Sequence, residues 1–301
     1  MNPIITVIIP QKNSLDTLGR LLGSIPDDER IEVIVVDNSE KAIAKDQIDS
    51  KREFQLLHSS PDRFAGGARN VGLEAARGEW LVFSDADDFF TPNAFDVFFS
   101  YVESDYDLAY FKVTSVYDDT LEPSNRDEMW NGIIDGYVNG AIDETQAKID
   151  YVVPWGKMVR KCLVDAHQIK FDEVVASNDV MFSTKVGFYA KNFTVSNDIV
   201  YNVTTRKGSL ANRRDLRALE SRYRVRMRRN IFLKEQGLSD RQVSVMSFLY
   251  DSLKFGIQPF FRFIGLAIKN RQNIFIGYRN WAKTAQFVRK DDKEKKKYLK
   301  K

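Results

Sequence analysis

The chain has 301 residues, of which 43% are hydrophobic, 12% aromatic and 29% charged, with one cysteine and a formal net charge of +3 at pH 7. This apolar content can offset the conformational entropy lost when a core is ordered, which excludes a disordered chain. Cys162 has no second cysteine to pair with, which excludes a fold held by internal disulfides. No uncharged apolar run reaches the roughly 18 residues of a spanning helix, and no basic segment precedes the apolar N-terminal run. We therefore expect a globular protein suited to a reducing cytoplasm.

The small net charge is the sum of two opposite parts. Residues 1–205 contain 19 Lys+Arg against 34 Asp+Glu, a net charge of −15, whereas residues 206–301 contain 26 against 8, a net charge of +18. We expect the two parts to have different roles.

The first hundred residues alternate short apolar runs with helical patterns. Almost wholly apolar runs, typical of strands buried on both faces of a sheet, predict strands at residues 5–10, 32–37 and 79–85, with another at 53–58. Helical spacing predicts helices at residues 14–24 and 66–76. This alternation predicts an α/β fold with a doubly wound sheet, in which ligands bind at the carboxyl ends of the strands. The residues to inspect are therefore 10–13, 37–39 and 85–88.

The pattern is weaker further along the chain. A helix beginning at Pro92 and a strand at residues 108–116 are followed by the polar stretch 118–150, where Gly132, Gly136 and Gly140 indicate a loop or insertion. A helix after Asp179 and a strand at 197–203 are expected next. Only helices are predicted beyond that point, at roughly 214–236, 240–257, 259–269 and 273–289. We expect a domain at residues 1–210 and a basic amphipathic helical region at 211–301.

Three carboxylates lie within four residues at the end of the strand predicted at 79–85, namely Asp85, Asp87 and Asp88. Their mutual repulsion favours a bound cation, and Mg²⁺ or Mn²⁺ prefers one or two carboxylates combined with phosphate oxygens. The alternative is an acidic turn that caps the helix after Pro92.

Three segments occur in the order of a known family. They are VIIPQKN at residues 7–13, VVDNS at 35–39 and GGARNVGLEAARGEWLVFSDADD at 66–88. Together they resemble the inverting, nucleotide-sugar-dependent glycosyltransferases of family 2, whose fold is the Rossmann-like GT-A fold with a mostly parallel sheet. The last segment is similar to the family's ARN-x-G stretch followed by its DXD metal motif. The resemblance covers roughly residues 4–210, about two-thirds of the chain.

The resemblance implies roles for the residues at the donor site. Asp37 would accept a hydrogen bond from N3–H of the uracil of a UDP-linked sugar, with a helix N-cap as the alternative role. The other implied roles are a loop beside the base at Pro10 and Asn13, a nucleotide pocket lined by Arg69 and Asn70, a ribose or sugar contact at Asp85, and a metal site at Asp87 with Asp88.

Inverting transfer also needs a base, because the acceptor hydroxyl must lose a proton as it attacks the sugar. In this family the base lies in an acidic pair that opens a helix after a WGKLYR-like segment. Residues 153–182 have that form, with Asn178-Asp179 in place of Glu-Asp, so Asp179 is the expected base. The alternative is a carboxylate that only stabilises the N-terminus of a helix.

Two further residues have two open roles each. Trp155 is expected to shape the donor-sugar pocket, or else to be a buried core residue. The segment TTRKGSL at 204–210 resembles the family's Y-x-x-R-x-x-S stretch, so Arg206 is expected to close over the diphosphate, or else to lie in a solvated basic loop.

The basic third of the chain interleaves aromatic and basic residues at 255–283 and carries RYRVRMRR at 222–229. An anionic membrane surface is one expected partner. Packing on the first domain, or on a second copy in a homo-oligomer, is the alternative. Nucleic acid is the least favoured of the three.

The leading hypothesis is a metal-dependent glycosyltransferase that passes a sugar from a nucleotide sugar to a hydroxyl of a glycan or lipid-linked acceptor in surface polysaccharide synthesis. It would be cytoplasmic, or peripheral on the inner face of the cytoplasmic membrane. The alternative is a catalytically idle nucleotide-binding or interaction protein that acts through its basic helices. An idle domain would be expected to lose Asp87 or Asp179, and both are present. Short motifs do not encode the donor sugar, the acceptor or the linkage.

Overall fold

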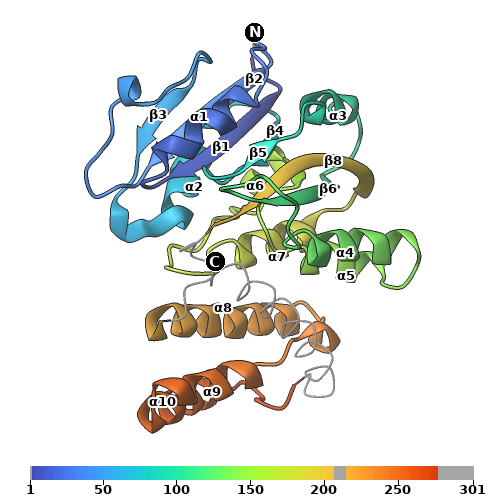
Figure 1. Cartoon of the computed structure of the whole chain (residues 1–301). Coiled ribbons are helices and arrows are strands. Elements are labelled where there is room, and N and C mark those ends of the chain that lie inside the picture. Colours follow the sequence, from blue (N-terminus) through green and yellow to red (C-terminus); the bar gives the residue numbers. More distant parts are fainter. Residues whose placement is uncertain (1, 207–214, 277–301) are drawn as a thin grey trace. The chain divides into compact units, whose positions relative to one another are not determined.

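A computed structural model describes residues 2–206 and 215–276 (Figure 1). The chain divides into two compact units. One comprises residues 1–174 and 178–206 and is called the sheet unit below, and the other comprises residues 175–177 and 207–301 and is called the helical unit. The boundary expected at residue 210 lies outside the described residues.

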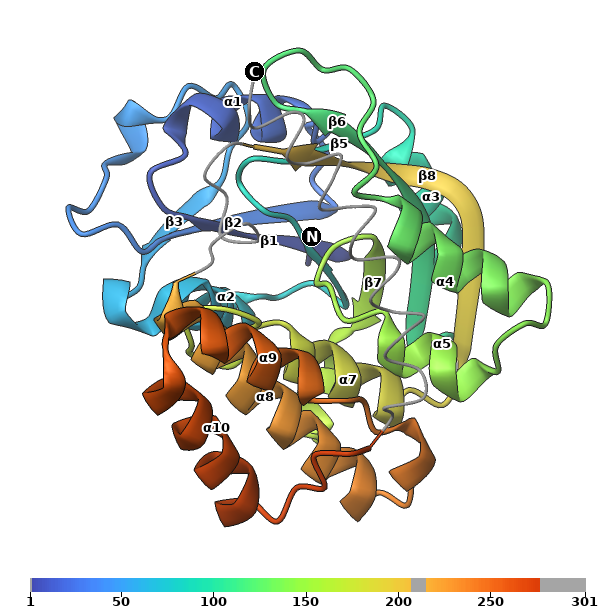
Figure 2. The same cartoon turned by 60° about the horizontal axis from the view of Figure 1, so that its bottom comes forward.

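The sheet unit contains one mixed sheet. Its strands are β1 (Ile5–Gln11), β2 (Ile31–Asp37), β3 (Gln55–His58), β4 (Trp80–Phe83), β5 (Phe89–Phe90), β6 (Leu108–Tyr117), β7 (Lys157–Arg160) and β8 (Phe193–Thr205). Their order is β3-β2-β1-β4-β7-β6-β8-β5. The first four strands in this order are parallel, β7 is antiparallel to both its neighbours, and the long strands β6 and β8 run parallel side by side (Figure 2). Chain order therefore reverses at β1, with β2 on one side and β4 on the other.

The helices of the sheet unit are α1 (Leu15–Gly23), α2 (Phe64–Ala75), α3 (Ala94–Tyr101), α4 (Glu128–Val138), α5 (Glu144–Asp150), α6 (Lys161–Ala166) and α7 (Val180–Tyr189), with 3₁₀ turns η1 (Lys45–Gln47) and η2 (Pro61–Arg63). The helices predicted at residues 14–24 and 66–76 are confirmed as α1 and α2, and all four strands predicted in the first hundred residues are present.

The apolar runs form central strands because both faces of the sheet are covered. All seven residues of β1 and of β2 are buried. Alternate residues enter different cores: Ile5, Val7 and Ile9 belong to the cluster that includes residues of α1, and Ile8 belongs to the cluster that includes residues of α2. A strand with two buried faces needs apolar residues at successive positions, which is the pattern of the sequence.

The prediction of a loop or insertion at residues 118–150 is wrong in part, because α4 and α5 lie there. Ile134 is fully buried and Trp130 packs against the core clusters, so tertiary packing outweighs the weak helix propensity of Gly132. The side chain of Asp143 accepts a hydrogen bond from the backbone N–H of Gln146 at 2.8 Å and so caps α5.

The helical unit contains α8 (Leu216–Glu235), α9 (Met246–Ser252) and α10 (Ile257–Lys269), with 3₁₀ turns η4 (Ser239–Arg241) and η5 (Leu253–Phe255). Tyr223 of α8 joins them: its ring stacks on Phe263 of α10 at a centroid distance of 4.7 Å, and its hydroxyl donates to the Phe263 carbonyl at 2.9 Å. The helix expected at 240–257 is broken into short pieces, and most of the one expected at 273–289 lies outside the described residues. Within the described ranges, the structure contains no helix with the length and apolar character needed to span a membrane.

Gly156 directly precedes β7, and the space beside its Cα is too small for a side chain. Its φ is +66°, and an added Cβ would lie 2.4 Å from the hydroxyl oxygen of Tyr151 and 2.9 Å from a methyl group of Val113. Both the backbone conformation and the crowding therefore require glycine here.

We predict that Gly156→Ala lowers the free energy of unfolding by about 2 kcal/mol or more, because it combines a strained φ with a steric clash. Gly132→Ala is the matched control, since Gly132 lies within α4 with nothing within 4 Å of an added Cβ, and it should leave stability unchanged or raise it by up to about 1 kcal/mol. Urea denaturation followed by circular dichroism measures both. Equal stabilities for the two variants would contradict the argument.

Candidate functional site

Polar residues from three parallel strands meet at one edge of the sheet. Gln11, the last residue of β1, is in register with Asp37, the last residue of β2. β4 lies on the other side of β1 and ends at Phe83, two residues before Asp85. This edge holds the carboxyl ends of the strands at the point where strand order reverses, which is where ligands bind in open α/β sheets.

Arg69 of α2 links two distant segments at this edge. Its side chain is 5% exposed and forms an ion pair with Asp85. The second terminal nitrogen donates to Oδ1 of Asn178 at 2.7 Å, and the guanidinium lies 5.3 Å from the centre of the Phe171 ring. One buried cation therefore holds the turn after β4 against the segment that leads into α7.

The first turns of α2 lie directly against that same segment. A Cβ added to Gly66 would lie 1.9 Å from the backbone oxygen of Asp172, so only glycine permits this approach. Asn70 donates to the Phe171 carbonyl at 3.0 Å and accepts from the Phe171 N–H at 2.8 Å. We expected Asn70 to line the nucleotide pocket, but its amide group is engaged with the backbone, and the residue positions Phe171 instead.

Asp179 is the residue just before α7, and its environment suits a base. Burial raises the pKa of its carboxyl group, the charge of Asp85 raises it further, and the positive charges of Arg69 and Lys157 oppose the rise. A carboxylate with a raised pKa binds a proton more readily than an ordinary aspartate, which is the property a general base needs near neutral pH.

Lys157 of β7 is fully buried beside this group. Its ammonium donates to the Tyr151 carbonyl at 2.8 Å and lies 4.8 Å and 5.0 Å from the ring centres of Tyr110 and Tyr151. Burial lowers the pKa of Lys157 well below its usual value, while the charge of Asp179 opposes that fall.

The three carboxylates after β4 have different environments. Asp85 pairs with Arg69. Asp87 is half-buried, and burial together with the charge of Asp85 raises its pKa. No other residue of the described chain donates a hydrogen bond to its side-chain oxygens. Asp87 therefore has free acceptor capacity beside a second carboxylate.

Asp88 instead anchors the turn to β8. It is 1% exposed; one carboxylate oxygen accepts from the backbone N–H of Thr204 at 2.7 Å, and the other accepts from the Tyr201 hydroxyl at 3.0 Å. We expected Asp88 to share a metal ion with Asp87, but protein donors occupy both of its oxygens. Burial raises its pKa well above the ordinary value, with the charge of Asp87 adding to the rise.

Three arginines surround the acid cluster. The positive charges of Arg126 and Arg206 lower the pKa of Asp87. Arg20 donates from one nitrogen to the backbone carbonyl of Asp87 and to Oδ1 of Asp118, both at 2.8 Å, and Arg206 lies 4.0 Å from the other oxygen of Asp118. Sequence reasoning identified Arg206 but missed the other two. Arg20 lies within the helix predicted at 14–24, where no motif distinguishes it from other helix residues. Arg126 lies in the stretch 118–150, which was predicted to be a loop or insertion.

The loop after β2 is organised by Asp37. Its carboxylate accepts from the N–H groups of Ser39 and Ile43, both at 3.1 Å, and lies 3.5 Å from Nδ1 of His58. Asp37 caps no helix, so the alternative of a helix N-cap does not apply. Asn13, at a φ of +55°, brings its N–H within 3.4 Å of the Ser39 hydroxyl. Pro10 is buried in β1 at the base of this loop.

Trp155 is a core residue in this structure. It is 2% exposed, and its ring is nearly parallel to that of Tyr201 at a centroid distance of 5.9 Å. Trp130 meets it edge-on at 5.8 Å. Of its two expected roles, burial favours the core role, because no open face remains to stack on a sugar.

The acid cluster suits a divalent cation that arrives with phosphate. Within the described residues, no group of three or more His, Cys, Asp or Glu side chains could hold a metal ion by itself. Mg²⁺, however, is commonly bound by one or two carboxylates with the remaining ligands from phosphate oxygens and water. Asp87, with unused oxygens and a raised pKa beside Asp85, fits that mode.

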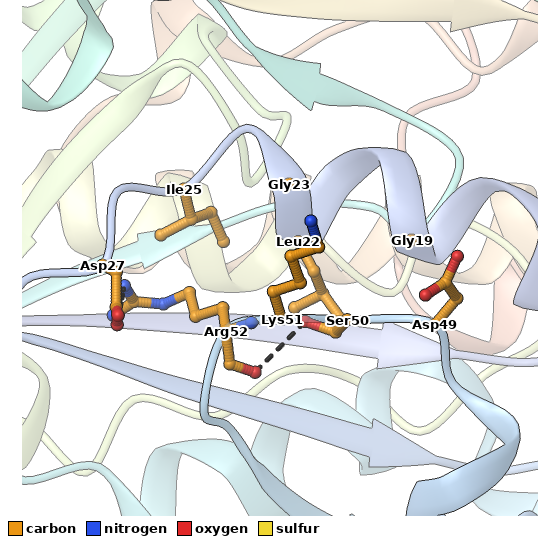
Figure 3. Close-up of a pocket in the computed structure, with 9 residues that line it drawn as sticks. All are labelled: Gly19, Leu22, Gly23, Ile25, Asp27, Asp49, Ser50, Lys51 and Arg52. Atoms are coloured by element: carbon orange, nitrogen blue, oxygen red, sulfur yellow. Dashed lines mark hydrogen bonds and ion pairs between the residues drawn. The ribbon is translucent and has the colours of Figure 1, made fainter.

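A separate pocket of about 380 Å³ lies away from this edge (Figure 3). Its lining residues come from the second half of α1 and the segments before β2 and β3: Gly19, Leu22, Gly23, Ile25, Asp27, Asp49, Ser50, Lys51 and Arg52. Arg52 donates to the Ile31 carbonyl at 2.7 Å, which explains its burial. The pocket contains none of the predicted site residues.

A model of the family described as Glycosyl transferase family 2 matches residues 6–164, just over half of the chain. The putative glycosyltransferase EpsH of Bacillus subtilis (strain 168) is 22% identical over 253 residues, which cover 77% of this chain and 70% of EpsH. The poly(ribitol-phosphate) beta-N-acetylglucosaminyltransferase TarS of Staphylococcus aureus (strain Mu50 / ATCC 700699) is 24% identical over 214 residues, covering 67% of this chain and 35% of TarS.

Solved structures of S. aureus TarS share the fold. The crystal structure of TarS 1-349 superposes with a TM-score of 0.60 at 21% identity, covering 84% of this chain and 72% of that one. The same fragment in complex with UDP-GlcNAc gives a TM-score of 0.57 at 21% identity, covering 84% and 73%. The eight-stranded sheet and its helices are thus the GT-A fold that the sequence predicts, with C-terminal helices following it.

We predict that Arg69→Met lowers the free energy of unfolding by about 3 kcal/mol, because it leaves the Asp85 carboxylate and the Asn178 amide without their shared partner. Lys170→Met is the control. It removes an ion pair with Glu74 in which both side chains are 63% exposed, and should cost less than about 1 kcal/mol. Denaturant unfolding compares the two. A loss for Arg69→Met no larger than that of the control would show that the bridge contributes little.

Proposed function

This chain belongs to glycosyl transferase family 2, and we propose that it transfers a sugar from a UDP-sugar to a hydroxyl group, with inversion at the sugar and with the help of a divalent cation. The observation that carries this proposal is the Arg69 bridge, which brings the acid cluster and the segment bearing Asp179 to one edge of the sheet. An idle binding protein would not need a base with a raised pKa at that place.

The donor nucleotide is proposed to lie over the ends of β1 and β2. Oδ1 of Asp37 accepts the Ser39 N–H and retains a further lone pair for N3–H of uracil, whereas Oδ2 accepts the Ile43 N–H and faces Nδ1 of His58. Pro10 and Asn13 would flank the base, and Asp85, fixed by Arg69, would accept from the ribose or the sugar. A neighbour of known structure, TarS 1-349, was solved in complex with UDP-GlcNAc, which supports a UDP-linked donor here.

The diphosphate is proposed to lie between Asp87 and the arginines around it. Asp87 would hold Mg²⁺ or Mn²⁺, and when bound the ion would supply positive charge to the phosphate oxygens. Arg126 and Arg206 act on the same place, as their effect on the pKa of Asp87 indicates. Fixed positive groups in a site of this kind stabilise negative charge that develops on a leaving group.

Asp179 is proposed to act as the base. It removes the proton of the acceptor hydroxyl while that oxygen forms a bond to the anomeric carbon. The bond between the anomeric carbon and the diphosphate oxygen breaks on the opposite face, and its electron pair leaves with UDP. The proton remains on Asp179 until it passes to solvent, so no oxidant or further reactant is needed.

The acceptor is proposed to be a hydroxyl of a glycan or lipid-linked chain in surface polysaccharide synthesis. Two relatives carry names for transfer to poly(ribitol-phosphate), and another is named a succinoglycan biosynthesis protein. We place the reaction in the cytoplasm, at the inner face of the membrane, because a lipid-linked acceptor would be presented there. The net charge of +18 over residues 206–301 suits that setting.

Asp179→Asn is expected to lower kcat by roughly 10²–10⁴-fold while donor affinity changes little, because the amide cannot accept the proton. Asp96→Asn is the control, since Asp96 is an exposed aspartate on α3, and it should match the parent. A coupled UDP-release assay and calorimetric titration with UDP measure the two properties. Transfer at the parental rate by Asp179→Asn would refute the assignment.

The same assignment predicts a direction for the pH dependence. A base must be deprotonated to act, and the pKa of Asp179 is raised above the ordinary value of 3.8. On acidification, kcat/KM should therefore fall with a midpoint above 3.8. A pH-rate profile checks this, and activity that persists undiminished to that value would contradict it.

Removal of divalent cations by a chelator is expected to abolish transfer, and added Mn²⁺ or Mg²⁺ should restore it. Asp87→Asn should raise the metal concentration needed for half-maximal activity by at least about tenfold, through the loss of one ligand charge. Asp119→Asn, at an exposed position in the turn after β6, serves as the control. Full activity of the parent in the chelator would exclude the metal requirement.

A further inference from the structure

The helical unit exposes an unusual number of large apolar side chains. Eleven such residues are exposed in the described chain, and seven of them lie between positions 250 and 275: Tyr250, Leu253, Phe255, Ile257, Phe261, Ile268 and Phe275. Single exposed apolar residues are ordinary, but seven within 26 residues point to a surface that meets something apolar.

α10 has two separate apolar faces. Phe263 and Ala267 are fully buried and belong to the core of the helical unit with Tyr223 and Leu249. Ile257, Phe261 and Ile268, here called the outer face of α10, are 61%, 63% and 72% exposed. Their spacings of four and seven residues place the three within about 40° of each other around a helix, on a side different from the buried pair. Packing onto its own unit requires only one apolar face, so among residues 2–206 and 215–276 the outer face has no element packed over it.

Basic residues accompany the outer face. Between residues 215 and 276 the sequence has 12 Lys+Arg against 5 Asp+Glu. Lys269 and Arg271 are exposed at the end of α10 and have no acidic partner in the described part of the chain. Lys269 lies about 100° around the helix from Ile268, so its long side chain can extend beside the apolar stripe. Apolar side chains flanked by lysine and arginine are typical of helices that lie in a membrane interface.

We propose that the outer face of α10 binds the surface of an anionic phospholipid membrane, with its apolar side chains in the boundary between headgroups and acyl chains and its cations at the lipid phosphates. The positive charge beside the outer face favours an anionic membrane over a second copy of the chain as its partner. A twofold dimer would place the same basic surface on both sides of the interface, where like charges repel, whereas anionic headgroups complement it. The inference does not depend on the proposed sugar transfer.

The test is co-sedimentation of the full chain with vesicles, in the absence of donor and acceptor. Vesicles of phosphatidylcholine alone are compared with an equal mixture of phosphatidylcholine and phosphatidylglycerol. The parent should bind the anionic vesicles, and Phe261→Ser with Ile268→Ser should bind them at least about tenfold more weakly, through the loss of buried apolar area. The matched control is Met129→Ser with Val138→Ser, which removes two exposed apolar residues of α4 and should bind like the parent.

A second variant tests the charges. Lys269→Glu with Arg271→Glu changes two exposed positions that make no described ion pair, so folding should be unaffected, and binding to anionic vesicles should fall by at least about tenfold. Thermal unfolding confirms that each variant is folded.

Three results would overturn the proposal. One is parental binding by the Phe261 and Ile268 variant, and another is equal loss of binding in the α4 control. The third is a parental dimer in light scattering that this variant converts to monomer while neither protein binds vesicles. The vesicle test measures no sugar transfer. A negative result in it would therefore not contradict the proposed reaction, and a protein without transferase activity could still be tested for membrane binding in this way.

Discussion

The arrangement of the site depends on the charge of Arg69. An arginine that is 5% exposed loses most of its hydration, which costs several kcal/mol unless its nitrogens find good partners. Here the partners come from the turn after β4 and from the segment before α7, which lie 16 and 109 residues away along the chain. Neither segment is a regular element at that point, so the shared cation fixes their separation in a way that backbone hydrogen bonding alone would not.

The remaining charges at the edge follow from the same constraint. Three carboxylates within four residues repel one another, and each is relieved in a different way. Asp85 forms an ion pair with Arg69, and Asp88 accepts hydrogen bonds from residues of β8. Asp87 is stabilised only by the longer-range positive charges of Arg126 and Arg206, which lower its pKa. Asp87 is therefore the one of these three carboxylates that accepts no hydrogen bond from another described residue, and its oxygens are the most open to a ligand. Incomplete neutralisation of this kind is what a site for a metal-bound diphosphate requires.

The sequence predicted those parts of the fold and site that depend on local pattern. The buried strands β1 and β2 follow from unbroken apolar runs, and the place of Asp85 and Asp87 follows from their position after such a run. β8 extends to Phe193–Thr205, beyond the predicted 197–203, because three exposed residues and a register shift opposite β6 interrupt its apolar pattern. The partners of Asp88 lie more than a hundred residues away, and Arg126, which precedes α4, is held by donating hydrogen bonds to the Ser115 hydroxyl and the Thr204 carbonyl. Such residues are determined by tertiary contacts, and no short motif encodes them.

Asn178 shows how a neutral side chain can preserve the function of this charge network. The family pattern has an acidic residue at this position, which would compete with Asp85 and Asp179 for the single positive charge of Arg69. The amide of Asn178 fills the same hydrogen-bonding place at 2.7 Å without adding a negative charge. Arg69 can therefore lower the pKa of Asp179 against the effect of burial, so that the carboxylate still ionises while remaining more basic than an aspartate in water. The substitution removes one carboxylate from a crowded site, so that Arg69 acts on two carboxylates, those of Asp85 and Asp179, instead of three.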